Sequence, residues 1–295
     1  MKITLLDGGS GDEIQRRLSR SPNGLWSAQA LIEEPDVVVD VHQAFIAAGA
    51  QIITTNTYST IPSYLGKAGI ADKYIQLTRF GGELARKAVD ESDSSVLVAG
   101  SIPPLSESYR ADLVPPANES LPIYQDLVVA LQNYVDMYFC ETMSSIAESL
   151  NAATQAIQFG QGKPVYVSWT LNESPGSGLR SGESVTAAFE ALSQLNVAGF
   201  MFNCSFPEAI EPAMLEIRML TDKPLGCYPN RSKRIAKDWT LDSDVDIGVR
   251  SGFSTDDFVA TSLRCIDLGA TMVGGCCEVG PEYIKALATA SKHLR

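Results

Sequence analysis

Eight short apolar segments alternate with helical patterns along the 295 residues, and a polar or cysteine side chain follows each apolar segment. The composition does not shift between the two halves of the chain. Strands that alternate with helices form parallel sheets, and eight parallel strands are the number that closes a barrel. The sequence therefore predicts one α/β domain over residues 1–295, a (β/α)₈ TIM barrel.

Composition and charge narrow the possible function classes. Hydrophobic residues make up 45% of the chain, as in a globular protein with a sizeable core. The 23 basic and 35 acidic residues give a formal net charge of −12, without a basic cluster, which argues against nucleic acid and anionic membranes as partners. No apolar run approaches the roughly 18 residues of a membrane span, and no signal segment precedes Ile3, so we expect a cytoplasmic protein.

The first half of the chain contains three expected strands. Residues 3–6 form an apolar run that ends at Asp7 and a glycine-rich turn. A helical pattern after Pro35 ends at Gly49, and the β-branched run 51–56 predicts the second strand.

The third strand is expected at 96–99, after a helical pattern from about 71 to 92. Gly100, Ser101 and the prolines at 103 and 104 are expected to end this strand. The segment 105–122 is rich in Ser, Pro and Asp, and we expect it to be a long surface loop.

The second half continues the alternation with five more strands. Strands are expected at 135–140, 165–170, 199–202 and 224–228, and the eighth lies in the stretch 269–278, which ends in two glycines and two cysteines. Helices are expected at 146–157, 185–195 and about 255–268, a Gly/Ser loop at 174–183, and an irregular polar stretch at 231–250.

The residues that follow the strands share one expected location. In a (β/α)₈ barrel the carboxyl ends of all strands meet at one rim, where active sites are found. The residues expected just beyond a strand are Asp7, Asn56, Ser101, Glu141, Thr170, Cys204, Tyr228 and Cys276.

Cysteine is the most informative residue type in this chain. Six cysteines are too few for a disulfide scaffold, and two histidines leave little material for a histidine metal site or base. Cys204 follows the sixth strand and Cys276–Cys277 follow the eighth, so the three thiolates can converge on zinc and leave a fourth position open. Gly274 and Gly275 would let the backbone bend so that both adjacent cysteines face inward.

The alternative for these cysteines is that they are small buried residues, because cysteine is among the most buried residue types. The spacing alone leaves both interpretations open. Cys140, Cys227 and Cys265 lack the glycine context, and we expect these three in the core.

Seven blocks along the chain carry a resemblance to a known family. They are Leu5–Gly9, Gly49–Tyr58, Gly100–Pro104, Glu141–Thr142, Asn203–Cys204, Tyr228–Asn230 and Gly274–Cys277. In this order, over nearly the whole chain, they resemble the signature blocks of the homocysteine S-methyltransferase family. The resemblance implies a (β/α)₈ barrel that binds Zn through Cys204, Cys276 and Cys277.

The resemblance also implies a reaction. Homocysteine would bind zinc as a thiolate and attack a methyl group on a sulfonium or quaternary ammonium donor. Asp7 and Glu141 would contact the substrate ammonium as catalytic and substrate-binding residues. Without the resemblance, Asp7 would cap the glycine-rich turn and Glu141 the following helix.

Other residues of the rim are expected to contact the two substrates. The backbone amides of Gly8 and Gly9 can approach the substrate carboxylate, because glycine leaves room for close contact. Thr54, Thr55 and Asn56 either contact homocysteine or only hold the barrel mouth, and by resemblance Asn203 is counted with the substrate-binding residues. Ring faces attract cations, so the expected donor-binding residues, with packing as the alternative, are Trp26, Tyr58, Tyr109 and Tyr228.

The methyl donor is the least determined part of this prediction. Residues 25–28 resemble the branch that uses S-methylmethionine or S-adenosylmethionine, rather than the betaine branch, and the further domains of a cobalamin-dependent enzyme are lacking. Residues 103–109 depart from the glycine-rich stretch of that branch. The alternatives are another thiol or a betaine-type donor, a metal-free enzyme with a cysteine nucleophile, and a non-catalytic zinc-thiolate sensor or carrier.

Overall fold

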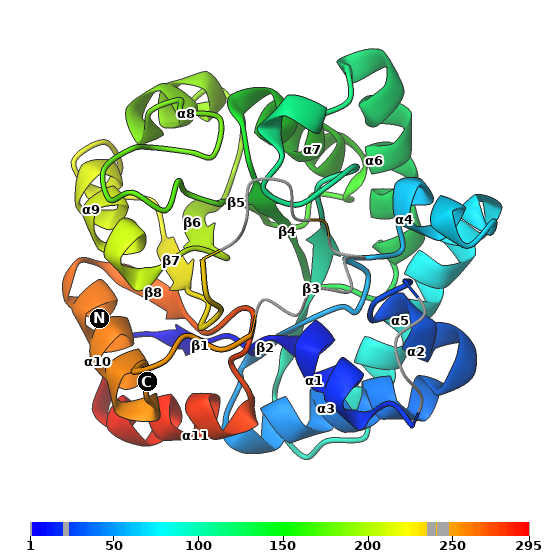
Figure 1. Ribbon diagram of the computed structural model, residues 1–295, viewed down its shortest axis with the longest axis horizontal. Coiled ribbons are helices and arrows are strands. Elements are labelled where there is room, and N and C mark those ends of the chain that lie inside the picture. Colours follow the sequence, from blue (N-terminus) through cyan, green and yellow to red (C-terminus); the bar gives the residue numbers. More distant parts are fainter. Residues whose placement is uncertain (1, 20–23, 235–239, 241–247, 295) are drawn as a thin grey trace.

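Parallel strands close on themselves in the computed structural model, which describes residues 2–19, 24–234, 240 and 248–294. The strand order in the sheet is β1-β8-β7-β6-β5-β4-β3-β2. A parallel bridge between Leu6 and Ile52 joins its two edges, so the sheet is the predicted barrel (Figure 1). Within the described residues the strands are β1 (Thr4–Leu5), β2 (Ile52–Thr54), β3 (Leu97–Ile102), β4 (Met137–Met143), β5 (Val165–Trp169), β6 (Gly199–Asn203), β7 (Leu225–Tyr228) and β8 (Ala270–Val273).

Helices surround the barrel and cover its outer face (Figure 1). They are α1 (Ser10–Arg17), α2 (Ala28–Glu33), α3 (Pro35–Ala48), α4 (Pro62–Lys67), α5 (Tyr74–Asp90), α6 (Ala117–Leu131), α7 (Ile146–Phe159), α8 (Val185–Leu192), α9 (Pro207–Arg218), α10 (Thr255–Asp267) and α11 (Pro281–Ala290). Short 3₁₀ turns lie at Ala71–Lys73, Ala111–Leu113 and Lys292–Leu294. The main core packs outward-facing strand residues against these helices, and a smaller cluster inside the barrel contains Phe139, Tyr166 and Met201.

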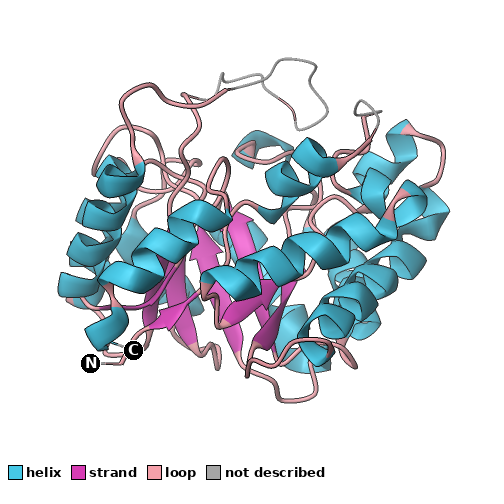
Figure 2. Cartoon of the chain, turned by 90° about the horizontal axis from the view of Figure 1, so that it is seen from below, coloured by secondary structure: helices cyan, strands magenta, loops and turns pink. Residues whose placement is uncertain are grey.

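The two ends of the barrel differ. Figure 2 shows the chain termini at one end and longer loops at the opposite end. At the first end the backbone N–H of Ile3 donates to the carbonyl of Leu294, which ties the termini together. None of the described helices is long and apolar enough to cross a membrane.

Most expected elements are confirmed, and local chemistry explains their ends. The helix expected after Pro35 is α3, and Gly49 ends it in the left-handed conformation with φ 108°. The helical pattern from about 71 to 92 is α5, preceded by a 3₁₀ turn.

Two strand ends were predicted too early. β3 continues through Gly100 and Ser101 to Ile102, directly before Pro103. β4 includes Glu141 and Thr142, which were expected beyond its end. A register irregularity between Cys140 and Met143 lets the strand bend there while it stays paired with β5.

The long loop expected at 105–122 is wrong in its last third. α6 begins at Ala117 and contains Pro122 as its sixth residue. A proline at this place removes the hydrogen bond to the carbonyl four residues before it and crowds that carbonyl. Burial of Tyr124, Leu127 and Leu131 against the core stabilises the helix in spite of that loss.

Two further expectations concern the second half of the chain. No helix was predicted after Cys204, but α9 occupies Pro207–Arg218, with proline at its first position. Most of the irregular stretch expected at 231–250 lies outside the described residues. Its described ends pair through an antiparallel bridge between Ser232 and Val249.

Candidate metal centre and active site

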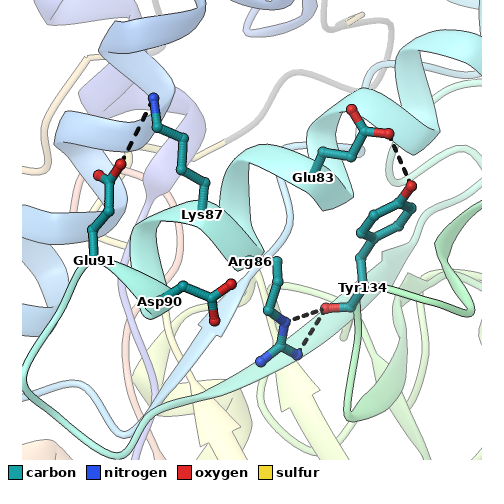
Figure 3. Close-up of a pocket in the computed structure, with 6 residues that line it drawn as sticks. All are labelled: Glu83, Arg86, Lys87, Asp90, Glu91 and Tyr134. Carbon is teal, nitrogen blue, oxygen red and sulfur yellow. Dashed lines mark hydrogen bonds and ion pairs between the residues drawn. The ribbon is translucent and has the colours of Figure 1, made fainter.

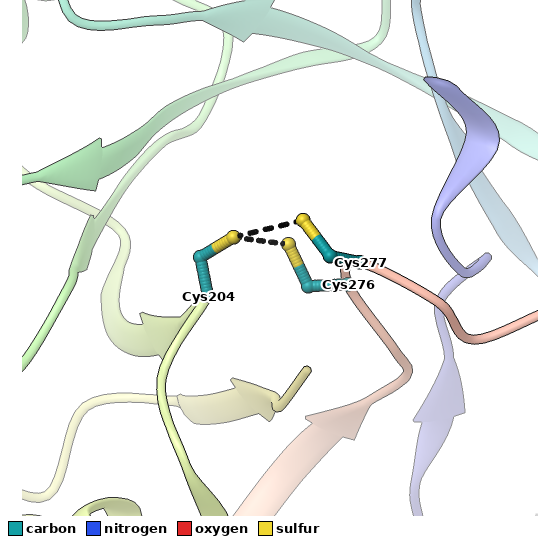
Figure 4. A group of neighbouring side chains, drawn as sticks. All are labelled: Cys204, Cys276 and Cys277. Carbon is teal, nitrogen blue, oxygen red and sulfur yellow. Dashed lines mark hydrogen bonds between the residues drawn. The ribbon is translucent and has the colours of Figure 1, made fainter. Parts of the chain in front are cut away.

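Three cysteine sulfurs meet at the rim of the barrel (Figure 4). The Sγ atoms of Cys204 and Cys276 are 2.8 Å apart, and those of Cys204 and Cys277 are 3.5 Å apart. All three sulfurs lie within 4.8 Å of one another. Cys204 comes from the end of β6 and the other two from the end of β8, so the predicted convergence is confirmed.

Backbone geometry explains how adjacent cysteines face the same partner. After Val273 the chain leaves the sheet, and a Cβ on Gly274 would lie 2.6 Å from the carbonyl oxygen of Asp7. A Cβ on Gly275 would lie 2.2 Å from Cγ1 of Val279. No side chain fits at either position, since real Cβ contacts do not become this short. The two glycines therefore let the loop after β8 turn against β1.

The sulfur cluster fits a zinc ion. Tetrahedral thiolates at about 2.3 Å from zinc are about 3.8 Å from one another. The cluster needs only a small expansion to reach that spacing, chiefly a separation of Cys204 from Cys276. Three sulfur ligands leave a fourth position for a substrate, which is the arrangement of catalytic rather than structural sites.

The electrostatics of the cluster favour a bound cation. Hydrogen bonds from Cys276 and Cys277 hold the pKa of Cys204 well below its usual range. The pKa values of Cys276 and Cys277 are raised, first by their hydrogen bonds to Cys204. A metal ion would displace these remaining thiol protons and convert all three residues into thiolates.

Two predicted carboxyl groups lie buried at this rim. Asp7 accepts hydrogen bonds from the backbone N–H and the hydroxyl of Thr54, at 2.7 and 3.0 Å, and Glu141 accepts from Ser101 and Tyr228. Burial raises the pKa of each to about 7. The charge of Asp7 adds to the effect on Glu141, so the two carboxyls are close enough to interact. A substrate ammonium beside them would compensate for this desolvation.

A third carboxyl group was missed by the sequence analysis. Asp12 in α1 accepts a hydrogen bond of 2.7 Å from the backbone N–H of Glu278, next to Cys277. Burial raises its pKa to about 7, and Cys204 contributes to the shift. Asp12 lies in a helix after the glycine-rich turn. It was missed because the prediction considered residues that directly follow a strand.

The four aromatic residues predicted for the donor lie around the sulfurs. The hydroxyl of Tyr109 is 3.0 Å from Sγ of Cys204. The ring of Tyr58 packs edge to face on Trp26, at 6.0 Å between centroids, and the charge of Cys204 raises the pKa of Tyr58, after burial. Tyr228 donates to Glu141 at 3.3 Å. That they bind the donor stays a prediction.

The segment 103–109, which departs from the family pattern, is firmly anchored. Glu107 accepts a hydrogen bond from Tyr64 and an ion pair from Lys67, both at 2.8 Å. Ser108 pairs with the hydroxyl of Tyr58 at 2.7 Å. These contacts fix the loop that presents Tyr109 to Cys204.

The predicted substrate contacts from Thr55, Asn56 and Asn203 have other partners in the structure. The hydroxyl of Thr55 accepts from the backbone N–H of Ser101, and the amide of Asn56 donates to the carbonyl of Ser27. Asn203 is fully buried, and its amide oxygen accepts two hydrogen bonds. These hydrogen bonds hold the barrel mouth together, and that the three residues also contact homocysteine stays a prediction.

Gly8 and Gly9 also have a packing role. A Cβ on Gly8 would lie 2.2 Å from the carbonyl oxygen of Val279, and one on Gly9 would lie 2.6 Å from that of Cys276. The N–H of Gly9 donates to Val279 at 2.9 Å. These glycines let the chain after β1 approach the cysteine loop, and that their amides bind the substrate carboxylate stays a prediction.

Unusual backbone conformations gather at the site. Among the described residues, the non-glycine residues with positive φ are Trp26, Tyr109, Thr142, Gln161, Cys204 and Glu278. All except Gln161 belong to the sulfur cluster, the chain next to it or its aromatic surroundings. Such conformations cost free energy and persist where the surrounding structure requires them, which is frequent at active sites.

A hollow on the outer surface shows a contrasting chemistry (Figure 3). It has a volume of about 360 Å³ and is lined by Glu83, Arg86, Lys87, Asp90, Glu91 and Tyr134. Arg86 donates to the carbonyl of Tyr134, whose hydroxyl donates to Glu83. Lys87 lies 3.9 Å from Glu91. These charges largely satisfy one another and leave no convergent set of ligands.

Comparisons with known proteins agree with the geometry. The family model described as homocysteine S-methyltransferase matches residues 4–291. The chain is similar to a selenocysteine Se-methyltransferase of Brassica oleracea var. italica, 29% identical over 319 residues, which cover 96% of this chain and 87% of that protein. It is also similar to the homocysteine S-methyltransferase of Escherichia coli (strain K12), 27% identical over 310 residues, which cover 98% of this chain and 95% of that protein.

A solved structure supports the same relationship. The metallated form of the homocysteine methyltransferase MmuM from Escherichia coli superposes with a TM-score of 0.81 at 26% identity, over 99% of this chain and 97% of that one.

Proposed function

The chain belongs to the homocysteine S-methyltransferase family, and from this premise we propose that it is a zinc-dependent enzyme with a sulfonium methyl donor. It transfers the methyl group of S-methylmethionine or S-adenosylmethionine to the sulfur of homocysteine and produces methionine. The convergence of Cys204, Cys276 and Cys277 on one point of the rim carries the proposal. We keep the cytoplasm as the proposed location.

The three cysteines would hold the zinc ion with one position left for the substrate thiol. When bound, zinc supplies a positive centre at which a thiol ionises at neutral pH without a protein base. The described rim offers no histidine for that purpose, because His42 lies in the core and His293 at the opposite end of the barrel. The chemistry of the site therefore matches the residues that are present.

Glu141 and Asp7 would orient homocysteine through its ammonium group. Both carboxyls are buried, and burial raises the pKa of each to about 7, so a cationic partner would favour their ionised forms at neutral pH. Their hydrogen bonds to Thr54 and Ser101 hold them in place. An ammonium held there points the thiol of the same molecule toward the open metal position.

Charge favours a cationic donor. Three thiolates around a divalent ion leave one net negative charge, and the substrate thiolate adds another. A sulfonium loses its positive charge in the reaction, so attack by a thiolate produces two neutral sulfurs. Tyr109 and Tyr58 lie near Cys204, with Trp26 packed on Tyr58, and aromatic ring faces attract sulfonium and ammonium groups.

A panel of donors tests this function. The protein with zinc and homocysteine is assayed for methionine with S-methylmethionine, S-adenosylmethionine and betaine in turn. We expect methionine with at least one sulfonium donor and none with betaine. Turnover with betaine alone would contradict the sulfonium proposal, and no methionine with any donor would contradict the methyltransferase itself.

A further inference from the structure

Arg180 is a half-buried cation with few partners. Its side chain is 12% exposed, and its Nε has no hydrogen-bond partner among the described residues. The nearest carboxylate, that of Glu173, lies 3.7 Å away, which is longer than a hydrogen bond. A guanidinium has five donors in a planar fork, so burial without partners is costly unless a ligand satisfies them.

The position of Arg180 connects it to the metal centre. Its guanidinium stacks over the ring of Tyr109, at 4.8 Å from the centroid. The hydroxyl of the same ring lies 3.0 Å from Sγ of Cys204. One phenol ring therefore separates the cation from a sulfur that would bind the metal.

The loop after β5 holds Arg180 at this position. Its backbone N–H donates to the carbonyl of Thr170 at 3.3 Å, where β5 ends. The neighbouring Leu179 is fully buried and forms an antiparallel bridge with Leu171. Arg180 is thus placed by a packed loop and not by a free surface segment.

Other arginines near the rim are engaged. Arg16 donates to Glu13 and Glu278, at 2.7 and 2.8 Å. Arg231 donates to the carbonyl of Glu278 at 2.8 Å and stacks on Tyr283. The Nε of Arg231 also lacks a partner, but its other nitrogens donate to backbone carbonyls. Arg180 differs from both, since its guanidinium makes no hydrogen bond to a described residue and lies over the ring of Tyr109.

We propose that Arg180 binds the α-carboxylate of the amino-acid methyl donor. Guanidinium and carboxylate form paired, charge-assisted hydrogen bonds. Glu173, whose side chain is 9% exposed, lies beside Arg180 and can receive the ammonium of the same donor. The inference rests on the proposed function, and it adds the feature that selects sulfonium donors with an amino-acid end.

The site has separate places for the two amino-acid substrates. Asp7 follows β1 and Glu141 lies in β4, and both are assigned to homocysteine. Arg180 and Glu173 belong to the loop after β5 and lie behind Tyr109. A donor with its carboxylate on Arg180 would place its sulfonium beside the ring of Tyr109, near the open metal position.

Steady-state kinetics of Arg180→Gln test the proposal. With S-methylmethionine we expect the KM of the donor to rise at least about tenfold, the loss typical of one charged hydrogen-bond pair. The KM of homocysteine and the zinc content should stay within about twofold of the parent protein. Arg180→Lys keeps the positive charge and loses the planar fork of donors. Its KM for the donor should lie between those of the parent protein and Arg180→Gln.

A donor without the carboxylate provides the second arm. S-methylmethioninamide cannot pair with a guanidinium as a carboxylate does, so the parent protein and Arg180→Gln should use it with equal KM. Arg264→Gln is the matched control, because Arg264 pairs with Glu211 at 2.7 Å between the outer helices α10 and α9 and has no part in the proposed donor site. It should leave both KM values unchanged.

The possible failures are distinguishable. An unchanged donor KM in Arg180→Gln, with methionine still formed, overturns the role of Arg180 alone. A rise in the KM of homocysteine instead of the donor overturns the assignment to the donor. No methyl transfer by the parent protein with any sulfonium overturns the proposed function and the inference with it.

Discussion

The six cysteines of this chain form two groups with opposite chemistry. Cys204, Cys276 and Cys277 meet at the rim, where the pKa of Cys204 is held well below its usual range. The other three, Cys140, Cys227 and Cys265, are fully buried in the main core. Burial raises the pKa of Cys140, and a hydrogen bond with Cys265 followed by burial raises that of Cys227.

The groups differ in backbone geometry as well as in burial, since Cys276 and Cys277 are only partly buried. Cys140 and Cys227 lie within β4 and β7, where strand geometry points each side chain into the helix-covered core. Cys204 has a φ of 48° directly after β6, and two glycines precede Cys276. The cysteines that we propose as ligands are those at which the chain has left a strand.

Removal of a rim cysteine should have the largest effect on zinc binding and activity. Cys276→Ala should lose zinc and lower kcat/KM at least about 100-fold, since even partners outside the ligand set contribute 10–100-fold. Cys265→Ala in the core should keep zinc and activity and lose about 1 kcal/mol of stability. Elemental analysis, a methionine assay and denaturant unfolding measure these effects. Equal zinc content in the two variants would contradict the division of the cysteines into a metal-binding rim group and a core group.

The glycines before Cys276 test the backbone explanation. In Gly275→Ala the new Cβ would lie 2.2 Å from Cγ1 of Val279, which is fully buried. The cysteine loop must then shift, and we expect zinc affinity to fall at least about tenfold. Gly66→Ala is the control, because its Cβ would meet only Ala71 at 3.7 Å. Competition with a chelator compares the two, and an unchanged affinity in Gly275→Ala would show that the glycine is not required.

Two buried glutamates extend the comparison to carboxyl groups. Glu141 and Glu148 are both buried, and burial raises the pKa of each to about 7. Only Glu141 lies at the site, whereas Glu148 accepts from the backbone N–H and hydroxyl of Ser144. Glu141→Gln should raise the KM of homocysteine about tenfold or more, the effect of a lost charged hydrogen bond. Glu148→Gln should leave this KM unchanged and lower stability, and the reverse result would exclude Glu141 as the ammonium partner.

Substitution of His42 is expected to have the smallest effect on activity at neutral pH. It is fully buried in α3, neither ring nitrogen has a hydrogen-bond partner among the described residues, and burial lowers its pKa to about 4. The unfolded chain therefore binds a proton as the pH falls from about 6.5 toward 4 while the folded chain does not. Stability should fall in that window by about 3 kcal/mol at most.

Urea unfolding across this pH range measures the effect of His42. His42→Phe should remove the part of the pH dependence of stability that the histidine contributes. It should leave the KM of both substrates unchanged at pH 7. If the stability of the two proteins depended on pH in the same way, the buried neutral ring of His42 would not contribute to acid destabilisation.

The sequence predicted the parts of the site that depend on strand ends. Cys204 and Cys276–Cys277 follow β6 and β8, and barrel closure alone brings such ends together. The helix α6 was missed because Pro122 signals a break, although burial of Tyr124, Leu127 and Leu131 stabilises the helix in spite of it. Glu141 was placed beyond β4 because the irregularity after Cys140 has no pattern in the sequence.

Contacts made by loops were beyond prediction. Tyr109 reaches Cys204 from a positive φ of 68°, in a segment anchored on α4 by Glu107. Arg180 reaches Tyr109 from the loop after β5. Neither distance follows from periodicity or propensity, because both depend on how separate loops pack over one rim.

The most direct test of the account is X-ray absorption at the zinc edge, with and without homocysteine. We expect zinc bound by the sulfurs of Cys204, Cys276 and Cys277 and by one lighter atom in the free protein. Homocysteine should replace the lighter atom and raise the number of sulfur ligands by one. A sulfur count that does not change with homocysteine would contradict the claim that this rim activates the substrate thiol.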